Sequence, residues 1–68
     1  MDKKEFYQHL VVYMHDHPQQ RKGQAAFNVM WYMFPDIADE FRGSELDPFY
    51  HDERTLDFVE ACFKKLEE

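Results

Sequence analysis

The amino-acid sequence predicts an all-α fold in which residues 1–68 form a single domain, a compact bundle of three main helices and one short helix. Three segments repeat apolar side chains at intervals of three and four residues, which is the spacing of one helix face. Apolar residues make up 44% of the chain and aromatic residues 18%, enough for the dense core that so short a chain needs. Strand patterns are weak throughout.

Residues 3–16 are predicted to form the first helix. Asp2 is placed to cap its start, and Pro18 disfavours helical geometry at His17 and so ends the helix there. The apolar face of this helix consists of Phe6, Leu10, Tyr13 and Met14, with Tyr7 at its edge.

Residues 20–34 are predicted to form the second helix, which Pro35 ends. Its apolar face consists of Gly23, Ala26, Phe27, Met30, Met33 and Phe34. Because Gly23 lies inside this face and costs about 1 kcal/mol of helix propensity relative to Ala, we expect it to permit the close approach of another helix.

Residues 36–42 are predicted to form the short third helix, with Gly43 as its C-terminal stop. Residues 44–52 form the longest predicted loop, and Phe49 and Tyr50 in it are expected to pack as an aromatic plug under the bundle.

Residues 53–67 are predicted to form the last helix, with Asp52 as its N-cap. Acidic residues lie near the start of this helix, and Lys64 and Lys65 lie near its end, as the helix dipole favours. Its predicted apolar stripe consists of Leu56, Val59, Phe63 and Leu66.

The charge of the chain is negative and uneven. Fourteen acidic residues against eight basic ones leave a formal charge of −6; residues 1–35 carry +1, residues 36–60 carry −7, and residues 61–68 are neutral. An acidic middle segment argues against direct nucleic-acid binding, because that needs Lys and Arg to neutralise phosphates. It fits a solvated face that keeps a small protein soluble, and it also fits a surface that imitates nucleic acid.

No apolar run reaches the roughly 20 residues of a membrane span, and the N-terminal residues lack the apolar stretch of a signal peptide. The single cysteine, Cys62, forms no disulfide within the chain and fits a reducing compartment. We therefore expect a cytoplasmic protein that does not bind a membrane.

No metal, cofactor or catalytic site is expected. His15 and His17 flank Asp16, but residues two apart on a helix point about 200° away from each other, which disfavours a shared metal. Neither Ser44 nor Cys62 lies in a motif that supplies a base to a nucleophile. The chain is therefore not expected to be an enzyme.

A polar stripe lies on the second helix, away from its apolar face. Arg21, Gln24, Asn28 and Trp31 fall within roughly 80° of one another at 100° per residue. One interpretation is a partner-binding face, to which Asp47 and Tyr50 of the loop also contribute. The other is that this stripe holds the 44–52 loop, with Arg21 pairing Asp47 and Asn28 capping backbone groups.

Surplus aromatic side chains are a second sign of an interface, because interfaces favour Trp and Tyr. The rings that the predicted helix faces do not bury are Trp31, Tyr32, Phe49, Tyr50 and Phe58. A homodimer or an adaptor would use such rings, whereas a small core that simply contains large residues would bury them.

Three segments, Arg-Lys-Gly-Gln-Ala-Ala-Phe-Asn (21–28), Pro-Asp-Ile-Ala-Asp-Glu-Phe-Arg-Gly (35–43) and Leu-Asp-Pro-Phe-Tyr (46–50), precede the short last helix. In this order they resemble a group of small, mostly uncharacterised proteins encoded by bacteriophages and prophages, over about residues 20–60. The resemblance implies a phage or mobile-element origin and, with it, the cytoplasm of a bacterial host. It transfers no activity and no catalytic residue, and it fits an accessory protein or an agent acting on a host protein.

The expected function is therefore protein–protein interaction, in which a bacterial or phage protein is bound and its action inhibited or modulated. The alternative is an acidic nucleic-acid mimic that blocks a host DNA- or RNA-binding enzyme, such as a defence nuclease or a polymerase. The mimic surface would consist of Asp36, Asp39, Glu40, Glu45, Asp47, Asp52 and Glu53.

Overall fold

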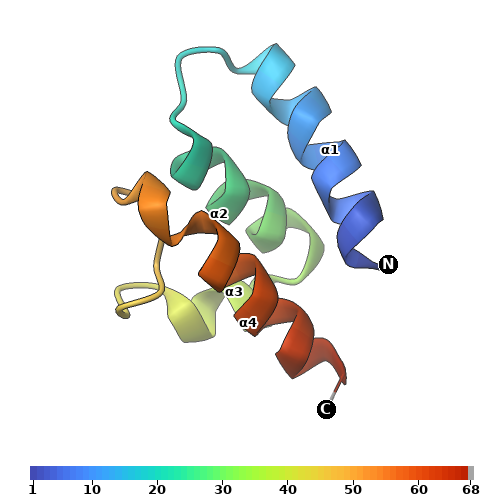
Figure 1. The fold of residues 1–68 in the computed structure, drawn as a ribbon, viewed down its shortest axis with the longest axis vertical. Helices are drawn as coiled ribbons and strands as arrows, with labels where there is room; N and C mark the ends of the chain where they lie inside the picture. The colour runs from blue at the N-terminus through green and yellow to red at the C-terminus, as the bar shows by residue number, and fades with distance from the viewer. Residues whose placement is uncertain (68) are drawn as a thin grey trace.

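A computed structural model describes residues 1–67. The helices are α1 (Lys3–Asp16), α2 (Lys22–Met33), α3 (Pro35–Phe41) and α4 (Thr55–Glu67), and a 3-10 turn, η1 (Asp52–Arg54), precedes α4 (Figure 1). No strand occurs within these residues, and the predicted all-α class is confirmed.

Local signals set most of the helix ends. The Asp2 carboxylate accepts a hydrogen bond of 2.9 Å from the backbone N–H of Glu5 and so caps α1, which ends at Asp16 before Pro18. Pro35 opens α3, and Gly43 adopts a φ of 76° immediately after Arg42, the C-cap of that helix. A residue with a side chain is strained at this φ, so glycine is the natural stop.

Helix α2 is the centre of the fold, since it contacts α1, α3, η1 and α4 (Figure 1). Because neighbours surround it, Ala25 and Val29 are buried although they lie outside its predicted apolar face. The core residues are Phe6, Leu10, Ala25, Ala26, Phe27, Val29, Met30, Ala38, Phe58, Val59, Cys62 and Phe63.

Helix α4 buries Val59 and Phe63 of its predicted stripe, but not Leu56 and Leu66. Leu56 is 62% exposed and Leu66 is 38% exposed, whereas Phe58, predicted as surplus surface, is fully buried and stacks on Phe27 with 5.7 Å between ring centres. The buried face is rotated by about 60° from the predicted stripe at 100° per residue. Apolar residues such as Leu56 and Phe58 point to different sides of this helix. The packing of neighbouring elements therefore decides which of them is buried.

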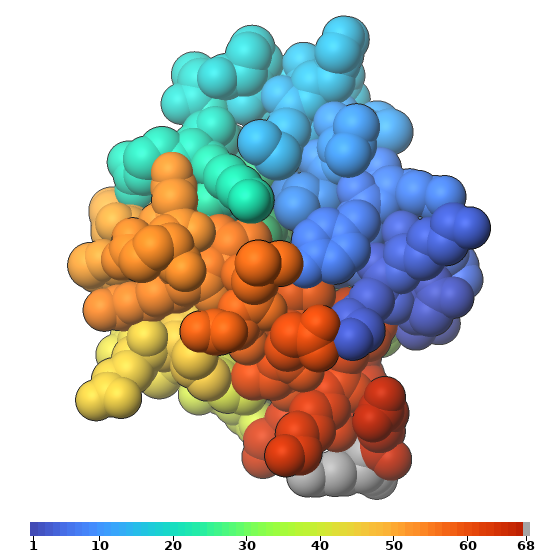
Figure 2. Space-filling model, in the orientation of Figure 1, coloured from blue at the N-terminus to red at the C-terminus, as the bar shows by residue number. Residues whose placement is uncertain are grey.

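The start of α2 packs against the loop and not against another helix. A Cβ atom at Gly23 would overlap the carbonyl oxygen of Pro48, and it would lie 3.1 Å from a carboxylate oxygen of Asp52. The expectation of a close helix–helix approach at Gly23 was therefore wrong, although the need for a small residue there holds. Figure 2 shows the orange end of the loop directly beside the blue-green start of α2.

Asp52 caps a different helix from the predicted one. Its side chain accepts a hydrogen bond of 3.1 Å from the backbone N–H of Gly23, at the start of α2. At the start of α4 it is the Asp52 backbone carbonyl that takes part, accepting from the Thr55 hydroxyl at 2.7 Å. The turn η1 leads the chain into α4 and leaves the Asp52 carboxylate directed at α2.

Candidate partner-binding site

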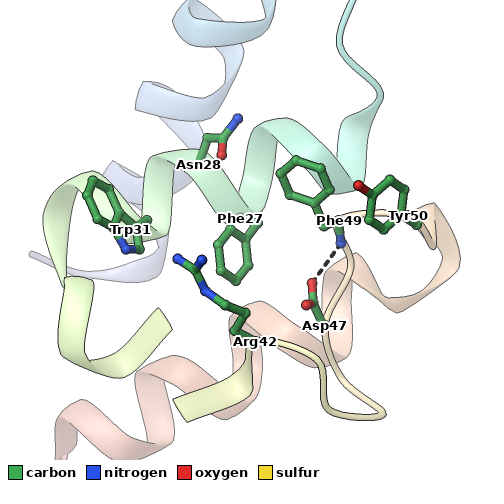
Figure 3. Close-up of a pocket in the computed structure, with 7 residues that line it drawn as sticks. All are labelled: Phe27, Asn28, Trp31, Arg42, Asp47, Phe49 and Tyr50. Carbon is green, nitrogen blue, oxygen red and sulfur yellow. Dashed lines mark hydrogen bonds between the residues drawn. The ribbon is translucent and has the colours of Figure 1, made fainter. Parts of the chain in front are cut away.

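An open hollow of about 330 Å³ lies between α2 and the loop that follows α3. We name it the α2–loop hollow (Figure 3). Its lining residues are Phe27, Asn28, Trp31, Arg42, Asp47, Phe49 and Tyr50.

Four of the six residues predicted for partner binding line this hollow, namely Asn28, Trp31, Asp47 and Tyr50. Arg21 lies beside it, with its guanidinium 5.7 Å from the centre of the Tyr50 ring. Gln24 is half-buried and is not among the lining residues. The fold therefore brings together residues that are up to 22 positions apart in the sequence.

Arg21 anchors the loop to α2. Its Nη2 donates a hydrogen bond of 2.9 Å to the backbone carbonyl of Phe49, and its Nε lies 3.8 Å from Asp52. The predicted pairing of Arg21 with Asp47 was wrong, because the Asp47 carboxylate is engaged by the loop backbone.

Asp47 shapes the loop from within. One carboxylate oxygen accepts from the backbone N–H of Gly43 at 2.6 Å, and the other accepts from the backbone N–H of Phe49 at 2.9 Å. Figure 3 shows the second of these bonds under the Phe49 ring. An Asp that bonds to backbone N–H groups on both sides of a turn fixes the turn's conformation. Asp47 thus fixes the conformation of the loop that carries Phe49 and Tyr50.

Asn28 ties α2 to α1 and does not hold the loop. Its side-chain nitrogen donates to the Tyr13 hydroxyl at 3.3 Å and to the Gln20 side-chain oxygen at 3.2 Å. The expectation that Asn28 caps backbone groups was therefore wrong. Its place on the edge of the hollow is held by these two bonds.

The rings of the hollow are only partly covered. Trp31 is 42% exposed and Tyr50 is 75% exposed, whereas Phe27 beneath them is buried. Phe49 is half-buried against Phe27, with 6.0 Å between ring centres, so only part of the predicted aromatic plug is formed. The hollow thus has an apolar floor and two exposed aromatic walls.

Phe27, Arg42 and Phe49 line the hollow without having been predicted for partner binding, and Arg42 is the one for which no role at all was predicted. Its guanidinium lies 5.4 Å from the centre of the Phe27 ring and pairs with Asp39 at 3.1 Å. Figure 3 shows it between Trp31 and Phe27. The sequence feature that could have predicted this role is the position of Arg42 immediately before Gly43, where the chain turns back towards α2.

Several residues of the predicted mimic surface are paired with cations of this chain. Asp39 pairs with Arg42, Glu40 lies 3.5 Å from Lys65, and Asp52 lies 3.8 Å from Arg21. Asp47 binds backbone N–H groups, and Glu53 lies 3.4 Å from His51. Within residues 1–67, the remaining two mimic residues, Asp36 and Glu45, form no ion pair.

Away from the hollow, the core encloses one free thiol, that of Cys62. Burial raises the pKa of the Cys62 thiol from 9.0 to about 12, with a smaller contribution from the charge of Glu40. Such a thiol stays protonated at neutral pH and is a poor nucleophile. In the part of the chain that the structure describes, no group of three or more His, Cys, Asp or Glu side chains is placed to hold a metal ion.

Comparisons with protein-family models, with curated proteins and with solved structures found no match to this chain. Among residues 1–67, no helix is long and apolar enough to cross a membrane. The geometry of the hollow is therefore the basis for a functional proposal.

Proposed function

We propose that the chain is a single bundle-like helical module that binds a bacterial or phage protein through the α2–loop hollow, and that it is of the phage-encoded kind its sequence resembles. The observation that carries this proposal is the exposure of Trp31 and Tyr50 around the buried ring of Phe27. Aromatic anchors around an apolar floor supply most of the affinity of many protein interfaces. The role of the bound module is to inhibit or modulate its partner.

Hydrogen bonds within the chain hold the loop and Asn28 in place around the hollow, which favours binding. Arg21 and Asp47 hold the loop by three hydrogen bonds to its backbone, and Asn28 is held by two more. A surface that is ordered before binding loses less conformational entropy when the partner arrives. The −7 charge of residues 36–60 would steer the encounter with a basic partner.

The test is a pull-down from bacterial lysate with immobilised wild type, Trp31→Ala, Tyr50→Ala and the control Val11→Ala. Val11 is 68% exposed on α1 and lies outside the hollow. The expected result is a partner retained by wild type and by the control, and lost or weakened by about 30-fold in the Trp31→Ala variant, the scale of a central aromatic anchor. Equal capture by all four proteins would contradict the proposal.

Trp31 also provides a direct readout, because it is the single tryptophan of the chain. Titration of the purified protein with the captured partner should shift the fluorescence emission of Trp31 to shorter wavelength as its exposed ring becomes buried. An unchanged emission at saturating partner would place the contact elsewhere on the molecule.

The nucleic-acid mimic remains a second candidate on the charge of residues 36–60 alone. The ion pairs of Asp39, Glu40 and Asp52 with cations of the same chain weigh against it, because they weaken the field that a basic cleft would meet. The same pull-down, eluted in salt steps, separates the two. A nucleic-acid enzyme released at moderate salt, displaced by DNA and indifferent to Trp31→Ala would favour the mimic.

A further inference from the structure

A second apolar surface lies on the other side of α2, in the groove that α2 forms with α1. We name it the α1–α2 face. It surrounds a hollow of about 240 Å³, and the lining residues that matter here are His9, Val12, Asp16, Val29, Tyr32 and Met33. Val12 is 62% exposed and Tyr32 is 73% exposed, so two large side chains on this face are left open to solvent. Figure 1 shows α1 at the edge of the molecule, lying along α2.

We propose that the α1–α2 face is the interface of a symmetric homodimer, in which two α1 helices lie antiparallel across a twofold axis near Val12. Twofold dimers are the commonest closed assemblies, and they use one self-complementary patch twice. The proposal concerns a different surface from the α2–loop hollow and does not depend on the proposed function.

The distribution of charge favours a second copy on this face. Two copies of a chain with a formal charge of −6 repel each other. The negative charge is concentrated in residues 36–60, which carry −7. Residues 1–35, which contain α1 and most of α2, carry +1. Two copies that meet through this part of the chain keep their acidic segments away from the contact.

The residues of α1 on this face are complementary to themselves in the antiparallel arrangement. His9 precedes Val12 by three residues, and Asp16 follows it by four, which puts all three on one side of the helix. At about 1.5 Å of rise per residue, His9 lies about 4.5 Å before Val12 and Asp16 about 6 Å after it along the helix axis. A twofold axis at Val12 therefore brings each His9 next to the Asp16 of the other copy.

The arrangement supplies what an isologous interface needs. The Val12 side chains and the Tyr32 rings form an apolar centre, and the two His9–Asp16 contacts form a polar rim. Asp16 also lies 3.7 Å from His15 of its own chain, with both side chains largely exposed, so its carboxylate is accessible to a second partner.

The test is sedimentation equilibrium of wild type, Val12→Glu and Leu56→Glu over a range of concentrations. Leu56 is as exposed as Val12, at 62%, but lies on α4 outside this face, so it is a matched control. We expect wild type and Leu56→Glu to rise from 8.3 kDa towards twice that mass, and Val12→Glu to dimerise at least about tenfold more weakly. Circular dichroism verifies that all three proteins are helical.

Two results would overturn the homodimer. One is a wild type that stays at 8.3 kDa up to about millimolar concentration, which would leave the face to some other occupant. The other is equal association of Val12→Glu and Leu56→Glu.

The antiparallel pairing has its own test. Asp16→Lys should weaken the dimer, and His9→Glu combined with Asp16→Lys should restore it, because a carboxylate and an ammonium group then face each other across the axis. Failure of the double variant to restore the dimer would overturn the antiparallel arrangement. A Tyr50→Ala variant should dimerise as wild type does, which separates this interface from the α2–loop hollow.

Discussion

The absence of a side chain at Gly23 allows the loop to lie against α2. The carbonyl of Pro48 occupies the space that a Cβ would need, and Pro48 itself is fully buried. This contact also brings Asp52 within hydrogen-bond distance of the Gly23 N–H. The absence of a Cβ atom at Gly23 therefore allows the loop segment with Phe49 and Tyr50 to lie against α2, where it forms one wall of the hollow.

Gly23→Ala should lower the free energy of unfolding by about 1–3 kcal/mol, the usual cost of overfilling a packed site. A decrease in the free energy of unfolding would be informative, because helix propensity alone predicts an increase. Ala is more favourable than Gly in a helix interior by about 1 kcal/mol. Urea denaturation measures the effect. Lys22→Ala, one residue earlier on the exposed side, is the control and should change stability by less than about 0.5 kcal/mol. A Gly23→Ala variant more stable than wild type would show that the loop does not press on this position.

At the scale of the element, α2 depends on a cap from a distant segment. Arg21 is its N-cap residue and forms no side-chain capping bond, so the first turn takes its acceptor from Asp52 instead. The first N–H groups of a helix have no partner within the helix, and the buried N–H of Gly23 therefore needs such an acceptor. The loop is thus fastened to α2 from both sides, by Asp52 to the Gly23 N–H and by Arg21 to the Phe49 carbonyl.

Asp52→Ala should destabilise the protein by about 1 kcal/mol, the typical cost of losing a helix cap, and should raise hydrogen exchange at Gly23. Asp52→Asn keeps a side-chain oxygen and should retain most of that stability. Glu53→Ala is the matched control, since Glu53 is exposed and pairs with His51 on the surface. Equal losses for Asp52→Ala and Glu53→Ala would contradict a capping role.

At the scale of the whole molecule, the core closes around α2 and encloses Cys62. This thiol is fully buried, and burial raises its pKa from 9.0 to about 12. Unfolding exposes it and returns its pKa to the ordinary value. Because the folded-state pKa is the higher one, the folded state holds the thiol proton more tightly.

The stability that comes from the protonated Cys62 should therefore be complete below pH 9 and be lost as the pH rises towards 12. Urea denaturation of wild type and Cys62→Ala across this range measures it. The variant should be less stable at neutral pH because of the cavity it leaves, and its stability should fall less steeply above pH 9. If stability falls equally with pH in wild type and in Cys62→Ala, the Cys62 thiol is not buried in the folded protein.

The two proposed interfaces lie in parts of the molecule that differ in charge. The acidic segment 36–60 supplies the loop side of the α2–loop hollow, while residues 1–35, with a charge of +1, contain the α1–α2 face. The two proposed interfaces thus differ in charge as well as in position. We expect partner binding at the hollow to weaken with salt more than the dimer does.

Local chemistry made the helix ends predictable. Asp2, Pro18, Pro35 and Gly43 act within a few residues of their own position, through a cap, a fixed φ or a left-handed turn. The face of α4 was not predictable in this way, because Leu56 and Phe58 are both apolar and only one of them meets a neighbour. Periodicity identifies a helix more readily than it identifies which side is covered.

Part of the candidate site was predictable as well. Asn28 and Trp31 share one side of a helix, so their proximity follows from helix geometry. Arg42 and the true partners of Arg21 and Asp47 were not, because they depend on how the loop returns to α2.

The sequence by itself determined the helical class, most of the helix ends and the uneven charge, since these depend on residue type and short-range backbone geometry. Only the tertiary structure decided that Gly23 meets the Pro48 carbonyl, that Asp52 caps α2 and that Phe58 is buried while Leu56 is exposed. Each of these is a contact between segments far apart in the chain. Such contacts are set by the packing of the whole core around α2, which no local pattern of residues specifies.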